Sequence, residues 1–283
     1  MSTVDLHIHS TISDGTDDWD ILVEKIYKSG IKAFSITDHD NFMFVEEIRN
    51  TSRRYGLKYV NGIEFSCRTN KLCHILGYNF DRNNADIIRL TERKMEMQKN
   101  KNRARIRRLS IQLGVRFSKE DLEWLYSNNR AGKPHIARLL VKNGYARTKQ
   151  SAFSDYLNKI KVKSENLYPD EAVDAIHKAG GIAVWAHPLG GEGETHLTKE
   201  KFSEQFEIVS KAGIDGIECR YSRYDERELD FLADFASKHG LLISGGSDYH
   251  GKNNDISLGE LNCFGKEIHP SDLNILEKIT GLR

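Results

Sequence analysis

The sequence predicts a mixed α/β protein, a barrel of parallel strands and helices that is interrupted by a helical insertion. Short apolar or β-branched runs alternate with helical stretches over residues 4–80 and again over residues 169–248, which is the rhythm of βαβ units. The segment between them, residues 82–165, carries no convincing strand. A chain of 283 residues has the length of one α/β barrel with an insertion.

The first part of the barrel is predicted from four apolar runs. A helix is expected over residues 15–31, because Thr16 can cap it, acidic residues fill its first turn and Gly30 can end it. The strands expected in this part are residues 4–9, 33–39, 59–66 and 74–80.

The same alternation returns after the insertion. Helices should begin near Pro169, Thr198 and Asp225. The strands expected beside them are residues 181–187, 212–220 and 240–248. We therefore assign residues 1–81 and 166–283 to the barrel and residues 82–165 to an inserted helical domain.

Composition and charge describe an ordinary globular chain. Hydrophobic residues make up 39%, charged residues 29%, and the formal net charge is +1, so nothing global favours nucleic acid or membrane. The run KNKNRARIRRL at residues 99–109 has six basic residues, but apolar residues recur in it at helical spacing. This favours a solvated helix face over binding of RNA. Without a long apolar or leader-like segment, we expect a cytoplasmic protein that has no membrane contact.

Two histidines near the start, His7 and His9, raise the question of a metal site. Residues two apart in a strand point the same way, although this pair alone is more often packed core. Ligand-type residues also follow the other expected strands: Asp14, Asp38, His39, Asp40, Glu64, His74, His187, Asp248 and His250. In a parallel barrel these strand ends share one rim. Imidazole and carboxylate without thiolate suit Zn, Mn or Fe, and we expect two or three divalent ions bridged by Glu64.

The motifs together resemble those of the polymerase and histidinol phosphatase (PHP) family, metal phosphoesterases of the amidohydrolase superfamily. They occur in the family's order: DLHIHSTISDGT, ITDHDN, GIEFSC, HILGYN, KPHIARLLVKNGY, GGIAVWAHP, GIECRYSR and SGGSDYHG. The resemblance implies a distorted (β/α)7 TIM-like barrel with a helical insertion domain that acts as a substrate cap. It also implies three metal positions, held by His7, His9, Glu64 and Asp248, by Glu64, His74 and His187, and by Asp14, His39 and His250. Asp38 and Asp40 would orient the imidazoles.

The chemistry implied by this resemblance is attack of a metal-bridged hydroxide on phosphorus. The expected catalytic residues are Glu64, His39, His187, Asp248 and His135. The leaving oxygen would take its proton from a metal-bound water or from His135. Substrate phosphate would be held by Ser10, Lys133, His135 and Arg223, although single surface charges are weak indicators.

The substrate expected is a small phosphorylated metabolite, either a 3′,5′-nucleotide bisphosphate or a cyclic phosphate of a phosphosugar, with a nucleotide or short RNA as a further option. Two departures bear on this choice: Lys133 replaces an arginine common in relatives, and LGGEGE, with Glu192 and Glu194, replaces a basic segment. Two alternatives are a metal-binding accessory module without catalysis and a C–N bond amidohydrolase. No protein partner is indicated.

Overall fold

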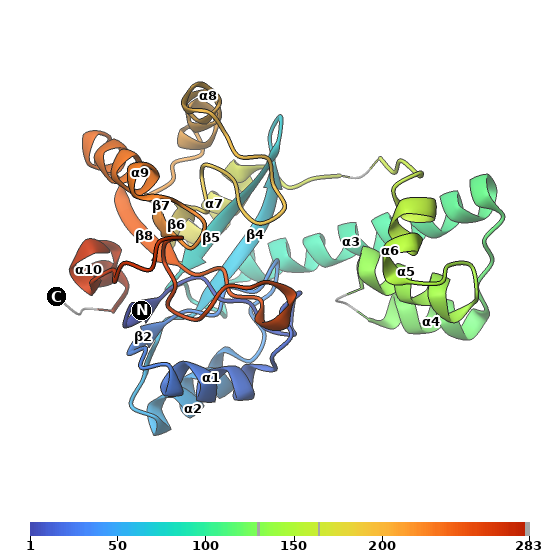
Figure 1. Ribbon diagram of the computed structural model, residues 1–283, viewed down its shortest axis with the longest axis horizontal. Helices are drawn as coiled ribbons and strands as arrows, with labels where there is room; N and C mark the ends of the chain where they lie inside the picture. Colours follow the sequence, from blue (N-terminus) through green and yellow to red (C-terminus); the bar gives the residue numbers. More distant parts are fainter. Residues whose placement is uncertain (129–130, 164, 281–283) are drawn as a thin grey trace. The chain divides into compact units, whose positions relative to one another are not determined.

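The computed structural model describes residues 1–128, 131–163 and 165–280 (Figure 1). The chain divides into two compact units. The first comprises Met1–Leu90 and Leu167–Arg283, and the second comprises Thr91–Asn166. No helix in the described part of the chain is both long and apolar enough to cross a membrane.

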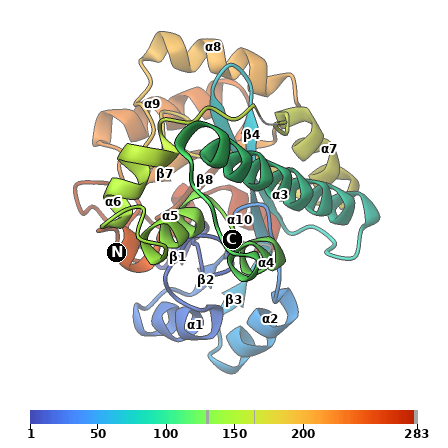
Figure 2. The same ribbon diagram turned by 90° about the vertical axis from the view of Figure 1, so that its right-hand side faces the viewer.

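A small parallel sheet opens the first unit. Its strands lie in the order β1 (Val4–Asp5), β2 (Ala33–Phe34) and β3 (Lys58–Tyr59). Helices α1 (Trp19–Lys28) and α2 (Val45–Arg54) connect these strands and lie side by side next to them (Figures 1 and 2). Buried apolar residues of both helices and the sheet form one core, including Ile8, Leu22, Ile26, Phe34 and Ile48.

A larger mixed sheet forms the rest of this unit. It contains β4 (Gly62–Arg68), β5 (Leu72–Tyr78), β6 (Ile182–Trp185), β7 (Gly216–Tyr221) and β8 (Leu242–Gly246), in that order. Strands β6, β7 and β8 run parallel, whereas β5 is antiparallel to both β4 and β6. The prediction of an all-parallel sheet was therefore wrong for β5, whereas β4 runs in the same direction as β6. Strands β4 and β5 form a hairpin, because residues 69–71 leave no length for the helix that a parallel crossover requires.

The two sheets are linked by residues that follow β1, β2 and β8. His39 forms a parallel bridge with Glu64, and Ile8 forms one with Tyr249. The backbone N–H of Asp248 donates to the carbonyl of His7 at 2.8 Å. The described strands thus form a mixed α/β fold of two sheets joined by isolated bridges, and a single closed barrel is not seen.

The helices after the insertion begin where the sequence predicts. They are α7 (Pro169–Lys178), α8 (Lys199–Ser210) with Thr198 as its N-cap, and α9 (Glu226–Lys238) with Asp225 as its N-cap. The chain then adds single 3-10 turns at Gly251–Asn253 and Pro270–Asp272 and ends with α10 (Ile275–Thr280).

The predicted cap of the first helix was wrong, because α1 has Asp18 at its N-cap position. The hydroxyl oxygen of Thr16 instead accepts a hydrogen bond from the backbone of Lys252. Thr16 therefore holds together two loops that are distant in sequence.

The second unit contains only helices and loops among its described residues. These helices are α3 (Ala85–Leu113), α4 (Lys119–Ser127), α5 (Lys133–Lys142), α6 (Lys149–Ala152) and a π-helical turn at Phe153–Leu157. Its separate core includes Leu109, Leu125, Ile136, Leu139 and Leu140. The first turns of α3 belong to the first unit, because Ile87 and Leu90 pack in its core.

Candidate metal centre

The segment around His7 and His9 follows β1 and is held by backbone hydrogen bonds to the segment around β8. Leu6 and Ile8 are fully buried in two different apolar cores. The alternating histidines face away from these cores, and both are fully buried, with ring centroids 5.1 Å apart. The alternation of the sequence thus directs two imidazoles to one place.

Glu64 and Asp248 face these two imidazoles. His7 Nε2 lies 3.3 Å from Glu64 Oε2 and 3.4 Å from Asp248 Oδ1, and His9 Nε2 lies 3.2 Å and 3.1 Å from the same atoms. Neither Nε2 atom has a hydrogen-bond partner in the described part of the chain. Two ligands bonded to one ion at about 2.1 Å lie about 3.0–3.4 Å apart, so these four atoms fit a shared cation.

The other oxygen of Glu64 faces a second pair of imidazoles. Oε1 lies 2.9 Å from His74 Nδ1 and 3.2 Å from His187 Nε2, and these two nitrogens are 3.2 Å apart. Glu64 and His74 come from the β4–β5 hairpin, and His187 follows β6. The carboxylate of Glu64 therefore lies between two ligand groups, as a bridging ligand must.

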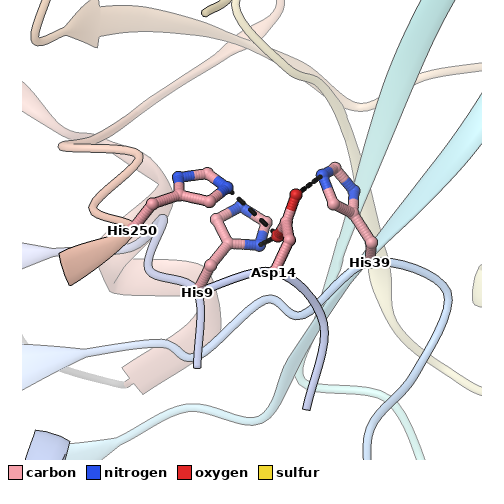
Figure 3. A group of neighbouring side chains, drawn as sticks. All are labelled: His9, Asp14, His39 and His250. Atoms are coloured by element: carbon pink, nitrogen blue, oxygen red, sulfur yellow. Dashed lines mark ion pairs between the residues drawn. The ribbon is translucent and has the colours of Figure 1, made fainter. Parts of the chain in front are cut away.

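A third group contains His9, Asp14, His39 and His250, as Figure 3 shows. Asp14 lies 3.2 Å from His250 Nε2 and 3.8 Å from both His9 Nδ1 and His39 Nε2. His39 Nδ1 also lies 3.0 Å from Glu64 Oε2. This group is more open than the others, since the Asp14 side chain is 55% exposed.

Buried carboxylates raise the pKa of some neighbouring histidines, whereas burial lowers the pKa of His39 to about 4. Burial alone would lower the pKa of His9, but its contacts with Asp248 and Glu64 raise it to about 10. In the same way Glu64 raises the pKa of His187 to about 9. Burial would raise the pKa of the Glu64 carboxyl, yet His39, His74 and His7 hold it well below its usual range. A site with this balance can exchange protons for metal ions.

The backbone is strained at two of these side chains. His187 has φ 27° and Asp248 has φ 58°, in the left-handed region that non-glycine residues rarely adopt. Each residue lies two positions after a strand, β6 for His187 and β8 for Asp248, and the positive φ turns the chain there. Such outliers cluster at functional sites, where the surrounding contacts hold them in place.

Sequence reasoning missed the group that supports these ligands, Glu218 on β7. It is fully buried, its Oε1 lies 2.9 Å from His7 Nδ1, and its Oε2 accepts a hydrogen bond from the backbone of His187 at 2.8 Å. The carboxylate therefore fixes the proton on Nδ1 of His7 and leaves Nε2 with a lone pair for a metal. The available signal was an acidic residue inside the apolar strand GIECR. Tyr221 has a similar role, because its hydroxyl donates to Asp248 Oδ2 at 2.8 Å.

Asp38 and Asp40, which were expected to orient imidazoles, accept hydrogen bonds from neighbouring segments of the chain. Asp38 accepts hydrogen bonds from the backbone and hydroxyl of both Ser10 and Ser13. Only Ser13 reaches a ring, with its hydroxyl 3.3 Å from His9 Nδ1. Asp40 accepts from the backbone of Ser66. These carboxylates order the loops that carry the ligands. Ser10 is fully buried, and its hydroxyl donates to Asp38.

The loops after β6, β7 and β8 are joined by Glu192. Its Oε2 lies 3.1 Å from an Arg223 guanidinium nitrogen and accepts a hydrogen bond from Asn254 at 2.7 Å. Asn254 also donates to the backbone carbonyl of Asp248. Arg223, expected to bind phosphate, is thus paired with a carboxylate of its own chain. The other expected phosphate contacts, Lys133 and His135, lie in the second unit.

Comparison with known proteins decides the family. The model of the PHP domain matches residues 5–250. The chain belongs to the PHP family. A 5′-3′ exoribonuclease of Haemophilus influenzae is 30% identical over 266 residues, covering 90% of this chain and 93% of the relative. A 3′,5′-nucleoside bisphosphate phosphatase of Chromobacterium violaceum is 27% identical over 88% of each chain.

A solved structure agrees with this PHP assignment. The crystal structure of a protein from Bifidobacterium adolescentis, described as a metal-dependent phosphoesterase, matches with a TM-score of 0.74 at 28% identity and covers 92% of both chains. The resemblance drawn from the motifs is confirmed. Together with the ligand groups, the comparisons support a metal-dependent hydrolase that acts on phosphoester bonds.

Proposed function

We propose that this PHP protein hydrolyses a phosphoester of a nucleotide, with removal of the 3′-phosphate of a 3′,5′-nucleoside bisphosphate as the first candidate reaction. The observation that carries the proposal is the position of Glu64, whose two oxygens face two separate groups of imidazoles. A carboxylate shared by two cations is typical of sites for phosphoryl transfer to water.

The chain offers donors for two or three divalent ions, and Mn, Fe or Zn fit the mixture of imidazole and carboxylate. We propose three sets of ligands: His7, His9, Glu64 and Asp248; Glu64, His74 and His187; and Asp14, His39 and His250. When bound, the ions would lower the pKa of water toward neutrality and neutralise charge on the phosphoryl oxygens.

The residues of the chain supply orientation. Glu218 holds His7 in the tautomer that a metal needs, and Tyr221 fixes Asp248. We propose Lys133 and His135 as contacts to substrate phosphate. Burial, together with the charges of Arg138 and Lys149, lowers the pKa of His135. That shift favours a neutral imidazole near pH 7, so His135 is better suited to binding than to protonating the leaving oxygen.

The nucleotide is placed first because relatives are named for action on RNA and on a nucleoside bisphosphate. A phosphoribosyl 1,2-cyclic phosphate 1,2-diphosphodiesterase of Eggerthella lenta is also 27% identical over 88% of this chain, so the cyclic phosphosugar is the second candidate. The C–N hydrolase alternative ranks lower because the relatives described above are named as enzymes that act on phosphoester bonds. We further propose that the two sheets are parts of one distorted (β/α)7 barrel, that residues 82–165 act as a substrate cap, and that the protein is cytoplasmic.

A substrate panel tests the proposal. The purified protein would be loaded separately with Mn²⁺, Fe²⁺ or Zn²⁺ and given a nucleoside 3′,5′-bisphosphate, a 5′-phosphorylated short RNA and a cyclic phosphate of a phosphosugar. We expect phosphate release from the bisphosphate, and none from the Glu64→Ala variant. Release only from the cyclic phosphate would overturn the substrate, and no hydrolysis of any substrate would overturn the function.

A further inference from the structure

The charge of the chain is divided unevenly between its two units. Thr91–Asn166 contains 19 lysines and arginines but only 7 aspartates and glutamates, a formal net charge of +12. Because the whole chain carries +1, the first unit carries −11. Bound divalent cations would offset part of the negative charge of the first unit and none of the positive charge of the second. Such an imbalance within one chain is typical of a unit that binds a polyanion.

An exposed tryptophan lies on this basic unit. Trp124 on α4 is 38% exposed, and its ring lies 5.9 Å from the imidazole of His135 on α5. The other two tryptophans are less accessible, since Trp185 is 2% exposed and Trp19 is partly buried. An aromatic face on a strongly cationic surface is the arrangement on which bases of single-stranded nucleic acid stack.

Unpaired cations surround His135. Arg138 and Lys149 are both exposed and close enough that their charges act on the imidazole of His135. Neither of them forms an ion pair with a carboxylate among the described residues. Within the described residues, no carboxylate neutralises these two charges near His135, so they are available to an anion.

A buried arginine adds to this charge. Arg105 of α3 is 8% exposed, and its guanidinium donates to the amide oxygen of Asn102 at 3.0 Å without a carboxylate partner in the described chain. It contributes, after burial, to lowering the pKa of Lys133. Among the described residues Arg103, Lys119 and Lys142 pair with Glu96, Glu123 and Asp121, and the unit as a whole has 19 basic residues against 7 acidic ones.

We propose that the second unit binds single-stranded RNA, with Trp124 as the platform for a base and with Arg138, Lys149 and the neighbouring cations as contacts to phosphates. A small phosphosugar would use neither a stacking platform nor charge spread over a whole unit. The proposal deepens the proposed function by naming an RNA end as the substrate class. It rests on that function only for the fate of the RNA after it is bound.

Binding can be tested without catalysis. The full-length protein, stripped of metal with a chelator, would be titrated with a short single-stranded oligoadenylate, and tryptophan fluorescence would be followed together with RNA anisotropy. We expect RNA to bind and to quench the fluorescence, with the logarithm of affinity falling steeply against the logarithm of salt concentration. Heparin, a polyanion without bases, should bind without quenching. Because no turnover is measured, a negative result here leaves the phosphoesterase proposal intact.

Variants locate the surface. Trp124→Ala should weaken RNA binding about five- to a hundredfold, and Trp124→Phe should keep most of the affinity because a ring remains. The double variant of Arg138→Ala and Lys149→Ala should reduce the salt slope by about one to two. Tyr27→Ala, which removes an exposed ring from α1, serves as the matched control and should bind normally.

Three results would overturn the proposal. The first is the absence of RNA binding by the unsubstituted protein, and the second is binding without quenching of the fluorescence. The third is unchanged affinity in both Trp124→Ala and the double variant, which would place the RNA elsewhere. Quenching is measured on the unsubstituted protein, so the proposal can be refuted even if a variant folds poorly.

Discussion

Glu218 offers the sharpest test of how the metal centre is organised. Its two oxygens lie 2.9 Å from Nδ1 of His7 and 2.8 Å from the backbone nitrogen of His187, and each accepts a hydrogen bond there. In Glu218→Gln, the amide has the same shape, but one of its ends becomes a donor. The side-chain NH₂ of glutamine then faces a second donor, either the backbone N–H of His187 or Nδ1–H of His7. In the latter case His7 can avoid the clash by moving its proton from Nδ1 to Nε2. That move removes the lone pair that faces Glu64 and Asp248.

The expected loss follows from the number of ligands affected. Removing a carboxylate that orients a metal-bound histidine typically costs 10- to 100-fold in metal affinity or activity, or about 1.4–2.7 kcal/mol. Since Glu218 touches two of the proposed ligands, we expect the upper part of this range for Glu218→Gln. Metal content by mass spectrometry, the metal dissociation constant and kcat would be measured on the same preparation.

The control is Glu260→Gln, which removes the same charge from a carboxylate that accepts one backbone N–H, that of Ser257. It should leave metal content and kcat unchanged. If Glu218→Gln bound metal as tightly as the unsubstituted protein and kept its kcat, the idea that Glu218 sets the tautomer of His7 would be refuted. Thermal unfolding of the metal-free variants separates a local effect from loss of the fold.

Four other changes have defined outcomes. Glu64→Ala should abolish turnover and lower the metal content by at least one ion, because two ligand groups share this carboxylate; full activity would contradict the metal assignment. Lys133→Ala should lower kcat/KM about tenfold or more, the value of a charged hydrogen bond, with bound metal unchanged in the same analysis. Glu192→Gln should lower KM for a bisphosphate about two- to fivefold, since it frees Arg223 from an exposed ion pair; an unchanged KM would argue against Arg223 as a phosphate contact. Metal binding at pH 7 should release protons, because the pKa of about 10 for His9 lies above this pH. Calorimetry in buffers of different ionisation enthalpy measures this release. No proton release would mean that the imidazole is already neutral.

The ligand groups could be predicted from the sequence because they follow from position along strands. His7 and His9 alternate with Leu6 and Ile8, so the two pairs face opposite ways, and Leu6 and Ile8 lie in apolar cores. The ligand-type residues at the other strand ends, and not this pattern alone, indicated the metal site. Residues that match the family motifs follow the other strands. The structure brings His39, His74 and His187 to Glu64, and Asp14 and His250 beside His9.

Other features depend on contacts that no local pattern encodes. Glu218 meets His7 across 211 positions of the chain, and the Glu192 pairing with Arg223 depends on how two loops fold back over the sheet. The direction of β5 had a local signal, the short stretch 69–71 between two apolar runs. The regular alternation of strands and helices elsewhere in the chain predicts a parallel strand at this position instead.

The β4–β5 hairpin has a consequence for how this sequence can change. Its register pairs Glu64 with Leu76 and Ser66 with His74, so the two ligands project diagonally from one face. Extra residues in the turn at 69–71 would lengthen the loop and leave both ligands where they are. One extra residue within either strand would shift the pairing by one position and turn a ligand to the opposite face. Insertions should therefore be tolerated in the turn of this hairpin, whereas insertions within β4 or β5 should abolish metal binding.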